Sequence, residues 1–131
     1  AEVVRVFEDR EIMHVAGNRY KFADLDLDIY YGNQIFSVGL PEDFVRRADA
    51  IVELSHLKLF ALYIYDIILT KLARGDAADL EDIKALFANR KVNTKVLKKR
   101  FVEVEKLSVV KDFAYNFNHF LNVVLPSWGL R

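Results

Sequence analysis

The first third of the chain alternates between apolar and polar side chains with a period of two, which is typical of β-strands. The clearest stretch covers residues 20–31. Its aliphatic side is formed by Leu25, Leu27 and Ile29, and its acidic side by Asp24, Asp26 and Asp28. This alternation predicts one strand over 20–31. The turn signal at 16–18 joins it to a shorter predicted strand over 11–15, and a further strand is expected over 34–38.

A short helix and two more strands are predicted in the middle of the chain. Pro41, Glu42 and Asp43 suit the start of a helix that runs to about Ala48. Proline fits the first helical position, and acids favour the positive end of the helix. Apolar runs over 50–54 and 57–61 are predicted as short strands.

From Tyr63 onward the apolar residues recur at helical spacing, which predicts four helices. The first ends at Gly75, the second opens at Asp76, and the third is capped by Asn93. The fourth covers about 109–124. Strands followed by helices predict an α+β fold, with a small mixed β-sheet followed by a C-terminal bundle of about four helices. We expect a single domain over 1–131, mainly β over 1–62 and helical over 63–131.

The composition excludes several kinds of chemistry. There is no cysteine, which rules out disulfides, zinc–thiolate sites and thiol nucleophiles. No apolar run approaches the roughly 20 residues of a membrane helix, and charges interrupt the start where a signal peptide needs an apolar run. We therefore expect a cytoplasmic protein with no membrane partner.

Charge is unevenly distributed although the chain is neutral. Residues 1–83 carry 9 basic and 16 acidic side chains, a balance of −7, and residues 84–131 carry 10 and 3, a balance of +7. This asymmetry favours a surface that meets a polyanion, or one half neutralising the other. A basic run, formed by Lys91, Lys95, Lys98, Lys99 and Arg100, is either a solvated helix face or a contact to nucleic-acid phosphates.

Two clusters of charge are candidates for chemistry. The acids of the 20–31 strand lie about 7 Å apart on one face, where they either hold a divalent cation or block aggregation at an exposed edge. The second cluster lies where two predicted helices meet. Lys71 and Arg74 end one helix, and Asp79 and Asp82 begin the next. This corner either pairs its own charges or forms part of a site.

The run DIILTKLARGDAADLEDIKALF, residues 66–87, resembles the C-terminal part of the minimal nucleotidyltransferases. These are DNA polymerase β-like proteins, found among prokaryotic proteins of unassigned function and abortive-infection toxins. The resemblance matches Lys71 to the family's helical lysine and Arg74 to its following basic residue. Asp79 and Asp82 match its two acids, whereas Ala78 replaces the usual basic residue. Either Asp26 or Asp28 matches the family's upstream carboxylate.

The resemblance implies an attack by an acceptor hydroxyl on the α-phosphorus of a nucleoside triphosphate. Asp26 and Asp28 would hold Mg²⁺ and act with Lys71 as catalytic residues. Lys71 and Arg74 would bind the nucleotide, and Asp79 and Asp82 would support these two cations. The acceptor would be RNA or protein.

An alternative follows from what the resemblance lacks. The family's N-terminal nucleotide-binding motif, a Gly-Gly or Gly-Ser turn followed by an Asp-x-Asp strand, is missing before Asp24, so we expect the chain to begin inside the fold. The alternative function is a non-catalytic interaction module, a degenerate relative of the toxin–antitoxin type. Such a module would act through the basic run or the aromatic stripe Phe113, Phe117 and Phe120. That stripe is either core or a homo-oligomer contact.

Overall fold

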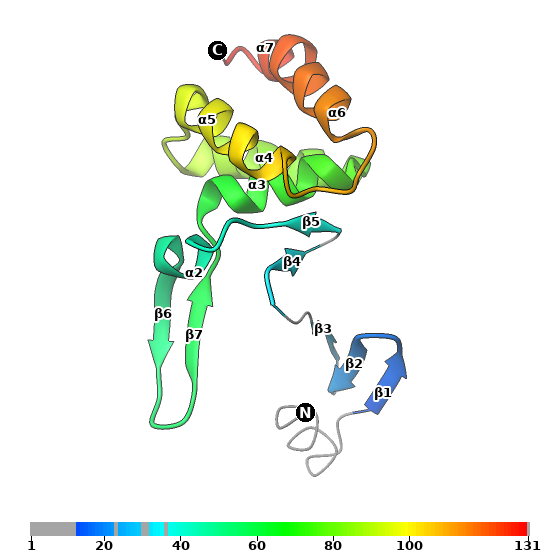
Figure 1. Cartoon of the computed structure of the whole chain (residues 1–131), viewed down its shortest axis with the longest axis vertical. Coiled ribbons are helices and arrows are strands. Elements are labelled where there is room, and N and C mark those ends of the chain that lie inside the picture. The colour runs from blue at the N-terminus through cyan, green and yellow to red at the C-terminus, as the bar shows by residue number, and fades with distance from the viewer. Residues whose placement is uncertain (1–12, 23, 30–31, 36, 131) are drawn as a thin grey trace. The chain divides into compact units, whose positions relative to one another are not determined.

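The computed structural model of the chain describes residues 13–130 apart from 23, 30, 31 and 36 (Figure 1). It divides into two compact units, Ala1–Gly32 and Asn33–Arg131. Small antiparallel sheets precede a group of helices, which confirms the predicted α+β class. Among the residues described, no helix is long and apolar enough to cross a membrane.

The first unit contains an antiparallel sheet in the order β1(Met13–Ala16), β2(Arg19–Phe22) and β3(Leu25–Asp28). The single strand predicted over 20–31 is therefore wrong over its described residues. Phe22 pairs with Leu25, so the chain reverses between them. The reversal places cations opposite acids, since Arg19 faces Asp28 and Lys21 faces Asp26. Opposite charges across a strand pair stabilise the sheet, and aspartate is common in turns.

The second unit begins with β4(Gln34–Ile35) and β5(Val38–Gly39), which form a small antiparallel pair in place of the strand predicted over 34–38. Ser37 interrupts that strand because its φ of 66° is left-handed backbone. The short helix α2(Phe44–Arg47) follows; it lies within the range predicted for a helix but begins three residues after Pro41, with Asp43 as its N-cap residue. It leads into a hairpin of β6(Asp49–Glu53) and β7(Lys58–Ala61), which projects away from the helices of its unit (Figure 1).

The helical part consists of α3(Ile64–Arg74), α4(Ala77–Asn89), α5(Thr94–Glu105) and α6(Phe113–His119), which continues through the π-helical turn η1(Phe120–Val124) into α7(Leu125–Ser127). Gly75 ends α3 in the left-handed conformation, with φ of 75°. The Asn93 side chain caps α5 by accepting hydrogen bonds from the backbone N–H groups of Lys95 and Val96. The last helix begins a turn later than predicted, at Phe113.

The core of the second unit lies between the helices and β5. Its most buried large side chains come from β5, from the residue after it, and from each helical element that follows α2: Val38, Leu40, Ile68, Leu69, Leu72, Ile83, Leu97, Val104, Phe113, Phe120 and Leu125. The Phe101 ring stacks on Phe117 with centroids 3.8 Å apart. The predicted aromatic stripe is thus buried in the chain's own core. On the same helix Tyr115 is 70% exposed, so it is available for contacts outside the fold.

Candidate functional site

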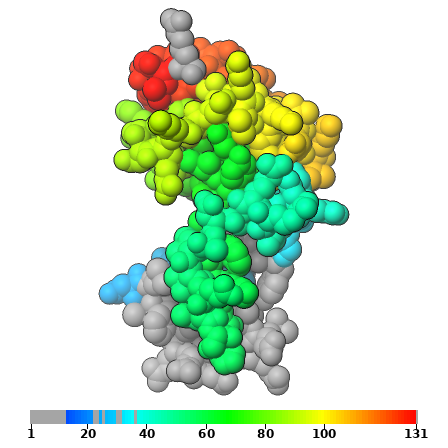
Figure 2. Space-filling model, turned by 90° about the vertical axis from the view of Figure 1, so that its left-hand side faces the viewer, coloured from blue at the N-terminus to red at the C-terminus, as the bar shows by residue number. Residues whose placement is uncertain are grey.

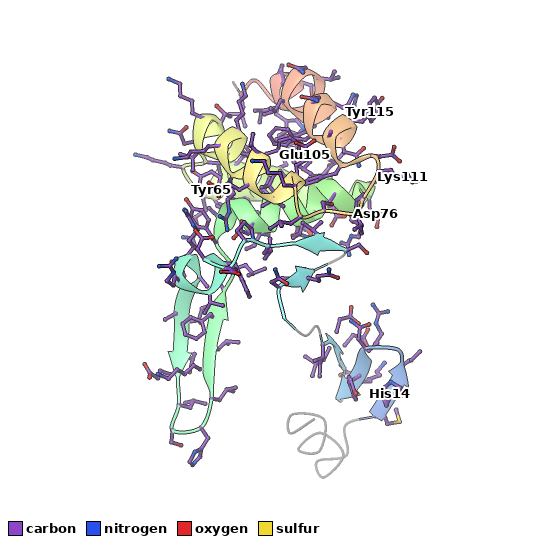
Figure 3. The ribbon with its side chains drawn as sticks, viewed as in Figure 1. His14, Tyr65, Asp76, Glu105, Lys111 and Tyr115 are labelled. Atoms are coloured by element: carbon purple, nitrogen blue, oxygen red, sulfur yellow. The ribbon has the colours of Figure 1, made fainter. Side chains whose placement is uncertain are left out.

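The corner between α3 and α4 brings together the four charged residues that the sequence placed there. Asp79 accepts two hydrogen bonds from Arg74, one of them from Nε at 2.7 Å and the other from Nη2. Lys71 Nζ lies 2.7 Å from Asp82 Oδ2 and 3.4 Å from Asp79 Oδ1. Asp76, labelled in Figure 3, lies at the same corner with its Oδ2 3.5 Å from Arg74 Nε.

Local sequence explains this geometry. Lys71 and Arg74 are three positions apart near the end of α3, so they share one side of the helix. Gly75 then turns the chain sharply, and Asp79 lies in the first turn of α4. Cations at a helix C-terminus and acids at a helix N-terminus each favour the adjacent helix end. The corner therefore assembles from residues within a single short segment.

The two acids of the corner differ in environment. The Asp79 side chain is 1% exposed, whereas that of Asp82 is 60% exposed. Hydrogen bonds from Arg74 are the main cause that lowers the pKa of Asp79; burial opposes them, and Lys71 adds to them. Asp79 is therefore an ionised, fixed anchor for both cations. Asp82 is a surface carboxylate that an incoming anion could replace at Lys71.

Asp26 and Asp28 lie on β3 of the first unit and are exposed. Arg19 donates to both oxygens of Asp28, from Nε at 2.8 Å and Nη2 at 2.9 Å, and this pairing lowers the pKa of Asp28. Within the described part of the chain, no three acids or histidines cluster in a way that could hold a metal ion. The convergence of Asp26 and Asp28 with the corner stays a prediction, because the two clusters belong to separate units.

A second charge cluster, not predicted from the sequence, surrounds Arg100. Its Nε and Nη2 donate to the two oxygens of Asp66 at 2.7 and 3.0 Å. Its Nη1 donates to Asp43 at 2.9 Å and to Glu103 at 2.7 Å. The side chains of Arg100 and Asp66 are 3% and 0% exposed. Burial by itself lowers the pKa of Arg100, but the bonds to Asp66, Glu103 and Asp43 outweigh it and raise that pKa.

Asp43 extends this cluster to the base of the β6–β7 hairpin. Its second oxygen accepts a hydrogen bond from Arg47 Nε at 2.5 Å. The Arg47 guanidinium lies over the Tyr63 ring, 5.7 Å from its centroid. Arg47 precedes β6 and Tyr63 follows β7, so this contact joins the two ends of the hairpin.

The placement of Arg100 corrects the predicted basic run. Lys91, Lys95, Lys98 and Lys99 are exposed, as a solvated face requires, but Arg100 points into the core. The signal that could have revealed this is Asp66, a lone acid inside the apolar run of α3. A carboxylate on a buried helix face needs a cation, because an unpaired buried charge is strongly destabilising.

In comparison with known proteins, residues 5–125 match the model of a family described as a nucleotidyltransferase of unknown function. Neither the curated proteins nor the solved structures gave a match. The matched range includes the α3–α4 corner and both of the strand acids Asp26 and Asp28. Because the match spans nearly the whole chain, the protein belongs to this family of nucleotidyltransferases of unknown function.

Proposed function

We propose that the chain takes part in transfer of a nucleotidyl group from a nucleoside triphosphate to an RNA or protein acceptor. In this reaction an acceptor hydroxyl attacks the α-phosphorus, the bond to the β-phosphate oxygen breaks, and pyrophosphate leaves. The observation that carries the proposal is the α3–α4 corner, where Lys71 is held by a buried acid on one side and an exchangeable surface acid on the other.

In this proposal Lys71 neutralises charge on the triphosphate. Its ammonium is a compact cation that binds phosphate oxygens without a fixed bonding plane. A phosphate would replace Asp82, whose side chain is 60% exposed, while Asp79 keeps Lys71 in place. Arg74 holds Asp79 through two hydrogen bonds, so its first role is to position that acid. Asp79 and Asp82 support the cations and do not bind metal.

Mg²⁺ at Asp26 and Asp28, which the resemblance implies, does not fit the described arrangement. Both oxygens of Asp28 accept hydrogen bonds from Arg19, and Lys21 lies opposite Asp26. A magnesium site needs carboxylate oxygens that are free to coordinate the ion. The roles proposed for Lys71 and Arg74 therefore do not depend on an ion at Asp26 and Asp28.

The test is transfer of label from nucleoside triphosphates labelled at the α-phosphate, with RNA and protein acceptors, in the presence and absence of Mg²⁺. We expect Lys71→Ala to reduce transfer by about 100-fold, the typical loss when one charge-stabilising donor is removed. The matched control is Lys106→Ala, which removes an exposed lysine just after α5 and outside the predicted basic run, and it should retain activity. Equal transfer by the Lys71 and Lys106 variants would exclude Lys71 from the reaction.

The alternative, a non-catalytic interaction module, is favoured by a different observation. Lys71, Arg74 and Asp28 are all engaged by charged partners within their own units. In such a module the corner would only stabilise the fold. Titration of the chain with triphosphate separates the two functions. Saturable binding that Lys71→Ala weakens supports the enzyme, and no binding by the wild-type chain supports the module.

A further inference from the structure

The β6–β7 hairpin exposes large apolar side chains along its whole length. Those between 42% and 60% exposed are Ile51, Val52, Leu54, Leu57, Leu59 and Phe60. Figure 2 shows the hairpin, in green, standing out from the helices of its unit. An isolated two-stranded hairpin is marginally stable in water, and a contiguous exposed apolar surface marks an interaction site. We therefore expect the hairpin to bind a partner.

The two edges of this hairpin are not equivalent. Strand β6 has an irregular register between Ala50 and Val52, where Ile51 is the extra residue, and it has acids at both ends, Asp49 and Glu53. A bulge and edge charges are the features that prevent strand pairing. Strand β7 is regular, has no acid and no proline, and carries its single charge, Lys58, at its first position beside the turn. Within the described part of the chain β7 pairs with β6 alone, so its other edge is open to another strand.

We propose that the β7 edge pairs antiparallel with β7 of a second copy of this chain, joining two hairpins into a four-stranded sheet. The proposal does not depend on the catalytic function. A two-fold axis that relates the strands must be perpendicular to the sheet, so each side chain stays on its own face. Directly opposed residues then differ by an even number of positions, and the axis passes through Leu59 or Phe60.

Both of these registers are free of like-charge contacts. An axis at Leu59 places Lys58 opposite Phe60 of the second copy, and an axis at Phe60 places Lys58 opposite Leu62. The only charge of β7 already pairs with Glu53 at 2.5 Å within its own hairpin. By contrast, full self-pairing of β6 about Ile51 would oppose Asp49 and Glu53 twice, and like charges directly opposite destabilise a sheet.

Charge also favours a second copy over a strongly charged partner. The chain has no net charge at pH 7 and a pI of about 7.1, so two copies approach without overall repulsion. A polyanion or an acidic peptide would find only Lys58 on the β7 strand, and that lysine has an acid beside it. The β7 edge is largely apolar and can pair with itself, so a second copy of the chain is the partner that fits it.

The first test is sedimentation equilibrium of the 131-residue chain and its variants. We expect a dimer whose dissociation constant rises at least about tenfold in Phe60→Lys and in Leu59→Lys, since a lysine would replace an apolar contact at the two-fold axis. The control Val109→Lys changes a residue that is 76% exposed between α5 and α6, and it should leave association unchanged. Far-ultraviolet circular dichroism checks that each variant is folded.

The second test uses the absence of cysteine, because a single introduced thiol is then unique. Opposed residues of an antiparallel pair have Cα atoms about 4.5–5.5 Å apart, within the range of a disulfide. Leu59→Cys or Phe60→Cys, whichever lies on the axis, should form a cross-linked dimer under mild oxidation. Ile51→Cys on β6 should cross-link more slowly.

Three results would overturn the proposal. One is a wild-type chain that is monomeric at every concentration. Another is cross-linking of Ile51→Cys as fast as that of both β7 variants. The third is a dimer that persists in Phe60→Lys and Leu59→Lys but dissociates in Tyr115→Lys, which would place the contact on the C-terminal aromatic helix. Faster cross-linking on β7, together with loss of the dimer in its lysine variants, supports it.

Discussion

Asp66 and Asp79 are the two acids that the described part of the second unit buries, and in each case one arginine contacts both carboxylate oxygens. A buried carboxylate is tolerated only with such a partner, because an unpaired charge loses its hydration and gains nothing in return. The two pairs differ in role. Asp79 lies beside a surface lysine at the candidate site, whereas Asp66 lies inside the fold.

Removing Arg100 should destabilise the protein strongly. Arg100→Met leaves Asp66 buried without a cation, and we expect the free energy of unfolding to fall by about 3–5 kcal/mol. Lys99→Met, the exposed neighbour, should change it by less than about 0.5 kcal/mol. Urea denaturation measures both variants. The double variant Asp66→Leu/Arg100→Met should recover much of the loss, and no recovery would show that the cost is one of packing.

The corner should make stability fall at acid pH. The folded-state pKa of Asp79 is below its ordinary value of 3.8, so the unfolded chain binds a proton first as the pH decreases. Stability from this residue is complete above the unfolded pKa and is lost as the pH falls through the folded one. The urea concentration at the unfolding midpoint, measured between about pH 7 and pH 2, should therefore decrease once the pH is below about 4. In Asp79→Asn this decrease should be less steep. An unchanged acid slope in that variant would contradict this assignment.

At the scale of elements, α3 connects both charge clusters. Asp66 lies in its first turn, and Lys71 and Arg74 lie near its end. Between them its inner side packs in the core through Ile68, Leu69 and Leu72. The end of α3 is also held by the last helix, because the Asn116 side chain donates to the Leu72 carbonyl at 3.1 Å. The position of Lys71 thus depends on helices that are distant in sequence.

A substitution at Gly75 measures how strongly the end of α3 depends on its contact with Asn116. A Cβ at residue 75 would lie 2.9 Å from Asn116 Nδ2, in addition to the strain of a left-handed backbone. Gly129 has nearly the same φ, 74°, but a Cβ there would meet no atom within 4 Å. We expect Gly75→Ala to lower the thermal midpoint more than Gly129→Ala, whose cost is backbone strain of about 1 kcal/mol. Equal shifts would mean that Asn116 moves away freely.

At the scale of the whole molecule, the sequence could predict those elements whose structure is decided by residues close together in the chain. The helices after residue 63 and the corner around Lys71 follow from spacing and from Gly75, and the structure has them within a few residues of the prediction. Contacts between distant segments could not be read in this way. The bond between Arg100 and Asp43 spans 57 residues. The reversal after Phe22 depended on cross-strand pairing with Arg19 and Lys21, which a single strand does not reveal.

The contacts at the base of the β6–β7 hairpin have a mechanical consequence. Asp43 joins the start of the hairpin to Arg100 in the interior, and the contact of Arg47 with the Tyr63 ring holds the two ends of the hairpin together. Farther from the base, β6 and β7 are joined by their strand pairing and by the Glu53–Lys58 ion pair near the turn of the hairpin. The base of the hairpin is therefore fixed to the interior, whereas the part beyond it is held by its own strand pairing. A partner bound to the hairpin would be connected through Asp43, Arg100 and Asp66 to α3, the helix that carries Lys71.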